Sequence, residues 1–365
     1  MFLAQSTWRA TIVVCVVLVF SFIATGFISS EYRRGKAALG STHFQAGQLL
    51  AAHGDLEGAA EEYRKALLFS PDSTMYRLSL GEALVDAGQL NEAESHLEQL
   101  LQEDPTNGRI NLMLARVAAK RGNRDDAIES YQRAVYEFWP ANELAERRQA
   151  RWELIGLLSK TDRRSELIGE LLQLYGNLPS GDNAQKLRVG DALLNYGASS
   201  EAGPVFRDLL KSTPQDPAVH RGLAEVYFNA GDYVQARHEF QKALRGSQQD
   251  TDAGNRLELT NEIIDLDPAL PSITALERLR RSENLLGQAI KDLSKCRNVE
   301  TDDGLKGRLR QAGQGVARKP LEESEDAALR MQSMTQQLWK DKTQFCKPAE
   351  LSDRAVDIVL QRVGQ

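Results

Sequence analysis

The sequence predicts an all-α protein whose helices form a solenoid of stacked hairpins, and a repeated spacing of glycine residues carries this prediction. The first three of these glycines, Gly54, Gly88 and Gly122, are evenly spaced at a period of about 34 residues. The same spacing separates Gly197 from Gly231. Self-similarity at a fixed period of this length is typical of repeat folds, in which each unit buries its apolar face only by stacking on its neighbours.

The residues inside one repeat predict two helices joined by a tight turn. After Gly54, the side chains of Ala59, Tyr63 and Ala66 recur at helical spacing, so two small residues flank a large one on one helix face. Small side chains let a neighbouring helix approach closely. Gly54 supplies the turn, where a positive φ angle is favoured, and Pro71 ends the second helix before the next repeat begins.

This pattern resembles the tetratricopeptide repeat, a helix-turn-helix unit of about 34 residues. The resemblance places six repeats over residues 40–248, with these expected bounds: 40–73, 74–107, 108–141, 149–182, 183–216 and 217–250. His43, Arg77 and Asn111 stand where the family favours a large apolar residue. We therefore expect looser packing for the first helices of those three repeats.

The fourth repeat is degenerate and carries additional residues. The interval from Gly122 to Gly197 exceeds two repeats by about seven residues, which is roughly two helical turns. Residues 141–150 are therefore expected to lengthen a helix without rotating its apolar face. A start at residue 149 places Gly156 at the small position of the first helix and Leu172 at the large position of the second.

The N-terminal segment predicts a single membrane-spanning helix. After a tail of residues 1–9, residues 10–28 carry no charge and would span roughly 28 Å as a helix, close to the ~30 Å hydrocarbon core of a bilayer. Residues 29–39 are expected to form a linker to the repeats. The alternative is a cleaved signal peptide, because residues 24–26 offer small side chains in an A-x-A-like arrangement.

Two features point to opposite orientations of the soluble domain. Arg33, Arg34 and Lys36 follow the apolar segment, and the positive-inside rule then favours a cytoplasmic domain. Cys296 and Cys346 are both confined to the C-terminal region, which favours an oxidising compartment. We expect a single-pass membrane protein with its soluble domain on the extracytoplasmic, periplasmic side, and keep the cytoplasmic orientation as the alternative.

The C-terminal third predicts helices that do not follow the repeat. Residues 251–298 are expected to form capping helices, and residues 299–365 a C-terminal helical region. In an up-down-up arrangement of the long helices, Cys296 and Cys346 lie at the same end, so a disulfide that encloses about 50 residues is sterically feasible. Two unpaired cysteines on packed faces are the alternative.

Composition and motifs exclude most function classes. A net charge of −6 argues against nucleic acid as a partner, because binding to phosphates needs a basic surface. The sequence contains no phosphate-binding loop, nucleophile elbow, H-E-x-x-H helix or haem-attachment site. The five histidines are scattered. We expect no enzyme, no cofactor, no metal site and no small-molecule substrate.

In tetratricopeptide-repeat proteins the first helix of each repeat lines a concave groove that holds a peptide or helix of a protein partner. By register, the resemblance implies these groove positions: Phe44, Met75, Leu78, Glu82, Arg109, Leu112, Arg116, Lys120, Leu194, Asn195, Arg221, Glu225, Phe228 and Asn229. Arg109, Arg116 and Lys120 share one helix face and are expected to receive an acidic segment. The alternative for each residue is an ordinary solvated face.

The sequence thus predicts a non-enzymatic, membrane-anchored scaffold that binds a protein partner at the cell envelope. The alternative is a regulatory or substrate-presenting subunit of an envelope enzyme, a secretion complex or a cytochrome-maturation complex. A soluble enzyme with its site in residues 270–365 is a third class, which the lack of catalytic motifs disfavours.

Overall fold

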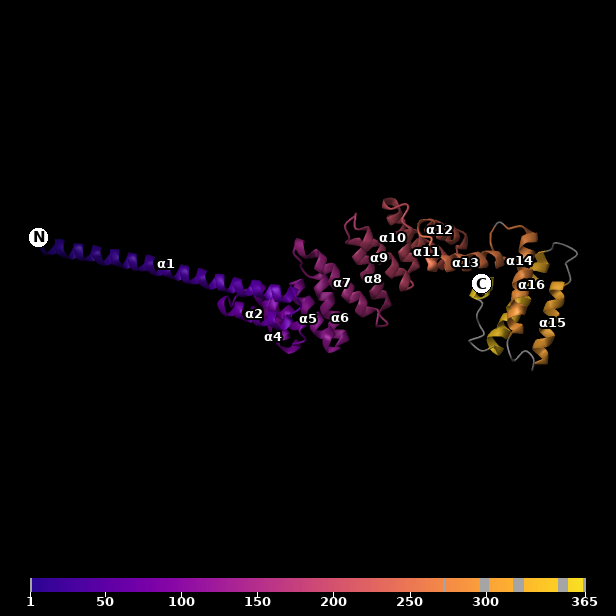
Figure 1. Cartoon of the computed structure of the whole chain (residues 1–365), viewed down its shortest axis with the longest axis horizontal. Helices are drawn as coiled ribbons and strands as arrows, with labels where there is room; N and C mark the ends of the chain where they lie inside the picture. Colours follow the sequence, from indigo (N-terminus) through magenta and orange to yellow (C-terminus); the bar gives the residue numbers. More distant parts are fainter. Residues whose placement is uncertain (1, 272, 296–301, 318–324, 347–353, 364–365) are drawn as a thin grey trace. The chain divides into compact units, whose positions relative to one another are not determined.

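A computed structural model describes residues 2–271, 273–295, 302–317, 325–346 and 354–363 (Figure 1). Across these ranges the chain is all-helical, with α-helices, one 3₁₀ helix and no strand. It divides into two compact units, residues 1–170 (unit 1) and residues 171–365 (unit 2). The predicted all-α class is therefore confirmed.

Unit 1 holds the first repeats. Its helices are α1 (Phe2–Ala52), α2 (Leu56–Phe69), α3 (Thr74–Asp86), α4 (Leu90–Glu103), α5 (Gly108–Arg121), α6 (Arg124–Tyr136), the 3₁₀ helix η1 (Ala141–Glu143), α7 (Leu144–Leu158) and the first part of α8 (Arg164–Gly176). Consecutive helices pack pairwise from the end of α1 to α7, as a solenoid of hairpins requires.

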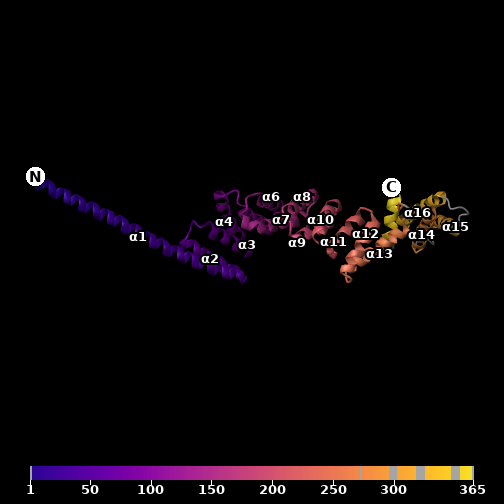
Figure 2. The same ribbon diagram turned by 90° about the horizontal axis from the view of Figure 1, so that it is seen from above.

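Unit 2 holds the later repeats and the C-terminal helices. Its helices after α8 are α9 (Asn183–Asn195), α10 (Ser199–Ser212), α11 (Pro217–Asn229), α12 (Tyr233–Gly246), α13 (Thr251–Leu266), α14 (Ala275–Ser294), α15 (Asp303–Ala317), α16 (Glu325–Phe345) and α17 (Arg354–Val363). Figures 1 and 2 show α9 to α13 side by side in chain order, each packed on the next.

The hairpin turns confirm the glycine pattern. Gly54, Gly88, Gly122, Gly197 and Gly231 each adopt a positive φ, between 71° and 83°. L-amino acids with a side chain rarely adopt this left-handed conformation, so glycine is required at these turns. The regular spacing of these glycines therefore reflects one turn geometry that recurs along the chain.

The polar residues that depart from the family pattern have polar partners in the structure. His43 contacts Glu62 on the second helix of its own hairpin at 2.7 Å, and Arg77 pairs with Glu103 at 2.9 Å. Asn111 is buried and donates hydrogen bonds to backbone carbonyls at the start of its helix. Each of these polar groups therefore has a partner within the protein, and the expected looser packing stays a prediction.

The fourth repeat differs in register from the sequence alignment. Gly156 is exposed with open space around it, and Leu172 is 40% exposed. Their preceding neighbours Ile155 and Leu171 are buried instead, at 2% and 0% exposure. The residues that pack therefore lie one position earlier than a start at residue 149 implies.

The additional residues before the fourth repeat lengthen α7 only in part. Residues 137–140 are extended, and η1 follows them before α7 begins at Leu144. Trp139 fixes this segment, because its indole donates a hydrogen bond of 2.7 Å to the carbonyl of Ala134 and its ring packs on Gly108. Of the segment 141–150, residues 141–143 form η1 and residues 144–150 belong to α7, so most of it lengthens the helix as expected.

Helix α1 joins the N-terminal segment to the first repeat without a break. Residues 29–39, which were expected to form a linker, are helical. The expected membrane segment, residues 10–28, also belongs to α1, and the side chains of residues 10–17, 19, 24 and 28 lie outside the described ones. Within the part of the chain that is described, no helix combines the length and apolar character needed to cross a membrane. The span stays a prediction.

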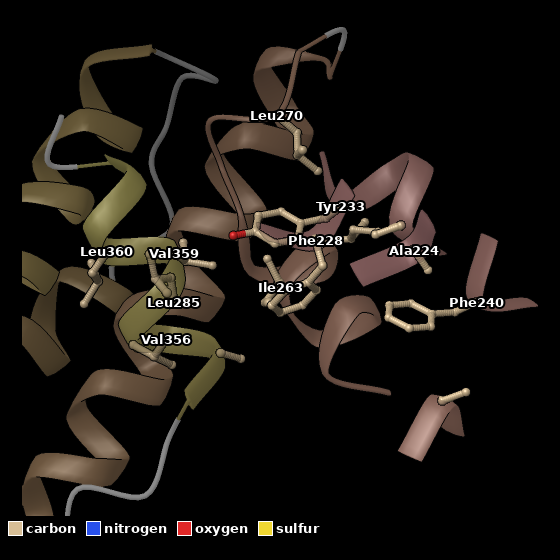
Figure 3. Close-up of a cluster of buried hydrophobic side chains, with 14 residues drawn as sticks. Ala224, Phe228, Tyr233, Phe240, Ile263, Leu270, Leu285, Val356, Val359 and Leu360 are labelled. Atoms are coloured by element: carbon tan, nitrogen blue, oxygen red, sulfur yellow. The ribbon is translucent and has the colours of Figure 1, made fainter. Parts of the chain in front are cut away.

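The last repeat of unit 2 is covered by the C-terminal helix. On α17, Val356 and Val359 are completely buried in a cluster that includes Ile263, Leu285 and residues of the sixth repeat. Figure 3 shows both valines beside Leu285. The sequence predicts capping over residues 251–298, and in the structure α17 joins that cap.

Polar contacts fasten α17 at both ends. Arg362 donates a hydrogen bond of 3.0 Å to the carbonyl of Gly231, at the turn of the sixth repeat, and lies 3.2 Å from the buried carboxylate of Asp267. Trp339 on α16 donates a hydrogen bond of 2.6 Å to Asp357. α17 thus connects the last repeat turn to the helices that follow it.

The long C-terminal helices form a second apolar cluster. α14 packs against both α15 and α16, and Leu286, Leu305, Met331 and Cys346 are among the buried residues they share. Cys296 lies outside the described residues. The predicted pairing of the two cysteines therefore stays a prediction.

Candidate functional site

Unit 2 contains a cavity of about 1020 Å³ between the first helices of consecutive repeats. Helices α9, α10, α11 and α13 and the turn after α9 contribute its walls. The lining residues are Asp191, Leu194, Asn195, Gly197, Ser199, Ser200, Arg221, Gly222, Glu225, Val226, Asn229, Ala230, Asp252 and Arg256. Most of them are polar, so the cavity offers hydrogen-bonding groups rather than an apolar slot.

The packing of one phenylalanine positions the two first helices around this cavity. Phe206 on α10 is completely buried between Gly190 on α9 and Gly222 on α11. A Cβ atom at either glycine would overlap the phenyl ring. Both glycines are therefore needed so that α9 and α11 approach α10 closely, which fixes the separation of the cavity walls.

One arginine of the cavity is held by a bidentate ion pair. Arg256 on α13 donates two hydrogen bonds, of 2.8 and 2.9 Å, to the carboxylate of Glu225 on α11. Its guanidinium group also lies 4.6 Å from the ring centre of Phe228. Fork-shaped pairing and a cation–π contact fix Arg256 in the wall and neutralise its charge.

The second arginine is also matched by a carboxylate. Arg221 on α11 lies 3.3 Å from Asp250, which is the N-cap residue of α13. The other oxygen of Asp250 accepts a hydrogen bond of 3.0 Å from the backbone of Ala253. Because this cap holds the carboxylate in place, Arg221 is directed toward α13.

Asp191 on α9 is the carboxylate of the cavity that lacks such a partner. Among the residues that the structure describes, Arg221 is the charged group that acts on it, and the two form no ion pair. Burial raises the pKa of Asp191, and Arg221 opposes this increase only in part. Asp191 therefore gives the cavity a half-buried carboxylate that no ion pair among the described residues neutralises.

The rim of the cavity carries amide and hydroxyl groups. Asn229 donates a hydrogen bond of 2.9 Å to the hydroxyl of Ser199. Asn195 and Ser200 are exposed and line the same hollow. Side chains of these types both donate and accept hydrogen bonds, so they suit the backbone groups of an extended peptide.

Five of the predicted groove positions line this cavity: Leu194, Asn195, Arg221, Glu225 and Asn229. Three others are core residues, with exposures of 7% for Phe44, 2% for Leu112 and 8% for Phe228. Phe44, for example, stacks on Tyr76 with ring centres 4.5 Å apart. The structure therefore brings together the predicted positions of the fifth and sixth repeats.

The predicted basic groove of unit 1 is largely paired within the protein. Arg109 makes two hydrogen bonds, of 2.8 and 3.0 Å, with Glu82, and Arg116 makes two, of 2.9 and 2.7 Å, with Glu153. Lys120 is exposed. These pairs connect first helices of neighbouring repeats, so the two arginines stabilise the stack.

The remaining predicted positions of unit 1 lie apart from its hollow. Met75 is 56% exposed and Leu78 is partly buried. A hollow of about 490 Å³ at the turn between α3 and α4 is lined by other residues, among them Asn91 and Arg121. The acidic-segment prediction for unit 1 is untested by these contacts.

Sequence reasoning missed several residues of the unit 2 cavity, namely Asp191, Ser199, Ser200, Asp252 and Arg256. The sequence does indicate Asp191 as a groove position, because it is the ninth residue of its repeat, the same register position as Glu82 and Glu225. Ser199, Ser200 and Arg256 lie outside the first helices of the six repeats, where the groove pattern makes no prediction.

Two family models match the chain, one in each unit. Residues 44–143 match the cytochrome c-type biogenesis protein H TPR domain, and residues 193–257 match a tetratricopeptide repeat. The first match covers hairpins of unit 1, and the second covers the repeats that form the unit 2 cavity.

Curated relatives share the repeats over part of their length. Human antiviral innate immune response effector IFIT1 is 26% identical over 183 residues, which cover 50% of this chain and 34% of IFIT1. Bovine BBSome complex member BBS4 is 33% identical over 231 residues, which cover 55% of this chain and 44% of BBS4. The chain thus spans less than half the length of these relatives.

Among solved structures, the chain is similar to YrrB, described as a TPR protein with an unusual peptide-binding site. The identity is 19% and the TM-score 0.29, with 59% of this chain and 90% of YrrB covered. The two family matches, with the helical hairpins and their positive-φ turn glycines, show that residues 44–143 and 193–257 are similar to tetratricopeptide repeats.

Proposed function

We propose that this protein is a non-enzymatic scaffold, anchored in a membrane at the cell envelope, that holds a segment of a partner protein in the unit 2 cavity. The carrying observation is the position of this cavity on the first helices of the fifth and sixth repeats, at residues that the repeat register assigns to a partner groove. Its volume lies at the upper end of the about 300–1,000 Å³ that small ligands occupy, which suits a peptide.

Blocking the cavity tests this function. The change Ser200→Trp puts an indole into the cavity from an exposed position, and Asn195→Trp does so from another wall. The matched control is His238→Trp, which adds the same group to an exposed site on α12 outside the cavity. Recovery of a specific partner in a pull-down is expected to fall by about tenfold for both blocking variants and to stay unchanged for the control.

The competing groove in unit 1 is tested in the same assay. Lys120→Glu reverses an exposed charge and leaves the ion pairs of Arg109 and Arg116 intact. If Lys120→Glu reduces recovery and Ser200→Trp does not, the binding site lies in unit 1 and the assignment to unit 2 is wrong.

Membrane anchoring is supported by the apolar N-terminal segment and by exposed side chains on α1. Leu18, Phe20, Phe22, Ile23 and Phe27 are 62% to 81% exposed. Exposed apolar surface of this extent indicates contact with a lipid bilayer or with another protein. Full-length protein is expected to stay with membranes after an alkaline wash, and a Phe20→Arg, Ile23→Arg double variant to be released. Release of the unchanged protein would contradict anchoring.

The match of residues 44–143 favours a second candidate, a regulatory or substrate-presenting subunit of a cytochrome-maturation complex. An envelope enzyme or a secretion complex belongs to the same class. Purification of the full chain under mild detergent distinguishes this role from a general scaffold. A constant enzymatic subunit at a fixed ratio favours it, and a variable set of partners opposes it.

A further inference from the structure

One register position distinguishes the unit 2 cavity from the rest of the repeats. The ninth residue is charged in the second, third, fifth and sixth repeats, where it is Glu82, Arg116, Asp191 and Glu225. Three of these form ion pairs with a neighbouring helix, with N–O distances between 2.7 and 2.8 Å: Glu82 with Arg109, Arg116 with Glu153, and Glu225 with Arg256. The position thus ordinarily serves to join neighbouring repeats.

Asp191 is the exception, and its surroundings explain why. Its side chain is one methylene shorter than that of the glutamates, and Arg221, the cation that acts on it, is held by Asp250 of α13. No ion pair of Asp191 occurs within the described ranges. The carboxylate therefore faces the cavity with its charge unmatched, at the place where other repeats carry an internal counter-charge.

The cavity as a whole carries an excess of negative charge. Asp191, Glu225 and Asp252 line it, and Asp250 lies beside it, against the two guanidinium groups of Arg221 and Arg256. Both arginines are engaged by carboxylates, whereas Asp252 is exposed on the first turn of α13. An acidic ligand would meet net repulsion here, and a cation would meet two available carboxylates.

We propose that the cavity binds an extended segment of a partner protein that carries a lysine or arginine side chain, and that this cation pairs with Asp191. This inference rests on the proposed function, because it names the chemistry of the same site. Asp252 adds attraction at the entrance, and the amides of Asn195 and Asn229 lie where they can bind the segment's backbone. The partner is thus opposite in charge to the one that the arginines of unit 1 suggest.

A library of random twelve-residue peptides displayed on phage tests the proposal without a known partner. Full-length protein in detergent is panned, and enriched peptides are synthesised with a fluorescent label and titrated by anisotropy. Enrichment of lysine or arginine is expected, with binding that weakens as salt rises. The change Asp191→Asn should weaken binding by about tenfold, the effect of losing one charge-assisted contact in a half-buried site.

Matched variants separate a specific contact from general attraction. Glu258→Gln removes one charge from an exposed position on α13, the helix that carries Asp252, outside the cavity, and should leave binding unchanged. Replacing the peptide's lysine by norleucine should weaken binding by the same factor as Asp191→Asn. The two changes together should weaken binding little more than either change alone. Such a cycle isolates the energy of the pair.

The remaining outcomes overturn the inference in distinguishable ways. Enriched peptides that are acidic or uncharged, or basic peptides that bind Asp191→Asn as tightly as wild type, defeat the inference. If those peptides still lose binding to Ser200→Trp, the proposed function stands. If they bind Ser200→Trp unchanged, or if no peptide is enriched, both proposals fail.

Discussion

The two units are built from the same hairpin, yet one charged residue on a first helix of unit 2, Asp191, is not paired as its counterparts in unit 1 are. In unit 1, Arg109 and Arg116 are both neutralised by glutamates of neighbouring helices, at 2.7 to 3.0 Å. In unit 2, Asp191 lies in a cavity where Arg221 acts on it without forming an ion pair among the described residues. A charged residue at a groove position therefore indicates a binding role only where the neighbouring repeat does not already match its charge.

The units also differ in the helices that flank their repeats. Unit 1 begins with α1, a single helix of 51 residues whose last part is the first helix of the first repeat. Unit 2 ends in helices outside the repeat, and α17 folds back onto the sixth repeat through Val356, Val359 and Arg362. A solenoid must cover the apolar face of its terminal repeat, and in unit 2 the cap includes α17.

The largest expected effect comes from breaking this cap. Val359→Asp places a carboxylate in a completely buried apolar cluster and should lower the free energy of unfolding of unit 2 by about 3 kcal/mol. Hydrogen exchange should show the loss in α12, α13 and α17, with the hairpins of unit 1 unchanged. Gln361→Asp, at an exposed position of α17, is the control. Equal loss of hydrogen-exchange protection in both units would show that the cap formed by α17 does not stabilise unit 2 selectively.

A smaller effect is expected from one pair of unit 1. Burial favours a raised pKa for Glu153, but hydrogen bonds from Arg116 and Tyr131 outweigh it, so the pKa lies below its ordinary value of 4.5. Glu153→Gln leaves Arg116 without a carboxylate and should cost about 1 kcal/mol at neutral pH, because both groups are partly exposed. Urea denaturation measures this, with the exposed Glu129→Gln as control.

The pH dependence of that difference checks its cause. Because the folded state lowers the pKa of Glu153, its contribution is fully present above pH 4.5 and is lost as the pH falls through the lowered value. Wild-type protein should therefore lose more stability on acidification than Glu153→Gln does. A difference that is constant from neutral to acidic pH would mean that the ion pair is not its source.

Much of the fold follows from local residue chemistry. The turn glycines are predictable because a positive φ depends on the residue itself, and all five adopt it. The fourth repeat lacks this marker, and the segment before it is held by a contact between residues far apart in sequence, Trp139 against Gly108. Without a turn glycine, spacing alone predicted Leu172 as the packed residue, whereas Leu171 is the buried one. The role of α17 likewise depends on contacts between parts of the chain that lie far apart in sequence, as between Arg362 and Gly231.

The site was predictable as a set of positions but not as a pattern of charge. Repeat register identified Leu194, Asn195 and Asn229 as groove residues, because helix faces follow from spacing alone. Whether an arginine is available to a partner depends on carboxylates supplied by other helices, such as Glu153 for Arg116. That is a tertiary property, and the sequence pattern of one helix does not contain it.

The smallest expected change in stability tests the comparison most sharply, because its sign is opposite to that of Glu153→Gln. Burial raises the pKa of Asp191 above its ordinary value of 3.8, so the ionised carboxylate is less favourable in the folded state than in the unfolded one. Its cost appears as the pH rises from 3.8 through the raised value. Asp191→Asn should therefore stabilise unit 2 at neutral pH, by about 0.5 kcal/mol or less.

The same variant should lose binding, so stability and recognition move in opposite directions at one residue. Thermal unfolding with and without a saturating lysine-containing peptide from the library measures both: the peptide should raise the melting temperature of wild type more than that of Asp191→Asn. If Asp191 only joined repeats, removing its charge would lower the stability of the protein, as is expected for Glu153→Gln. If Asp191→Asn is instead destabilised and binds the peptide normally, Asp191 belongs with the paired positions, and the difference between the two units reduces to the shape of the cavity.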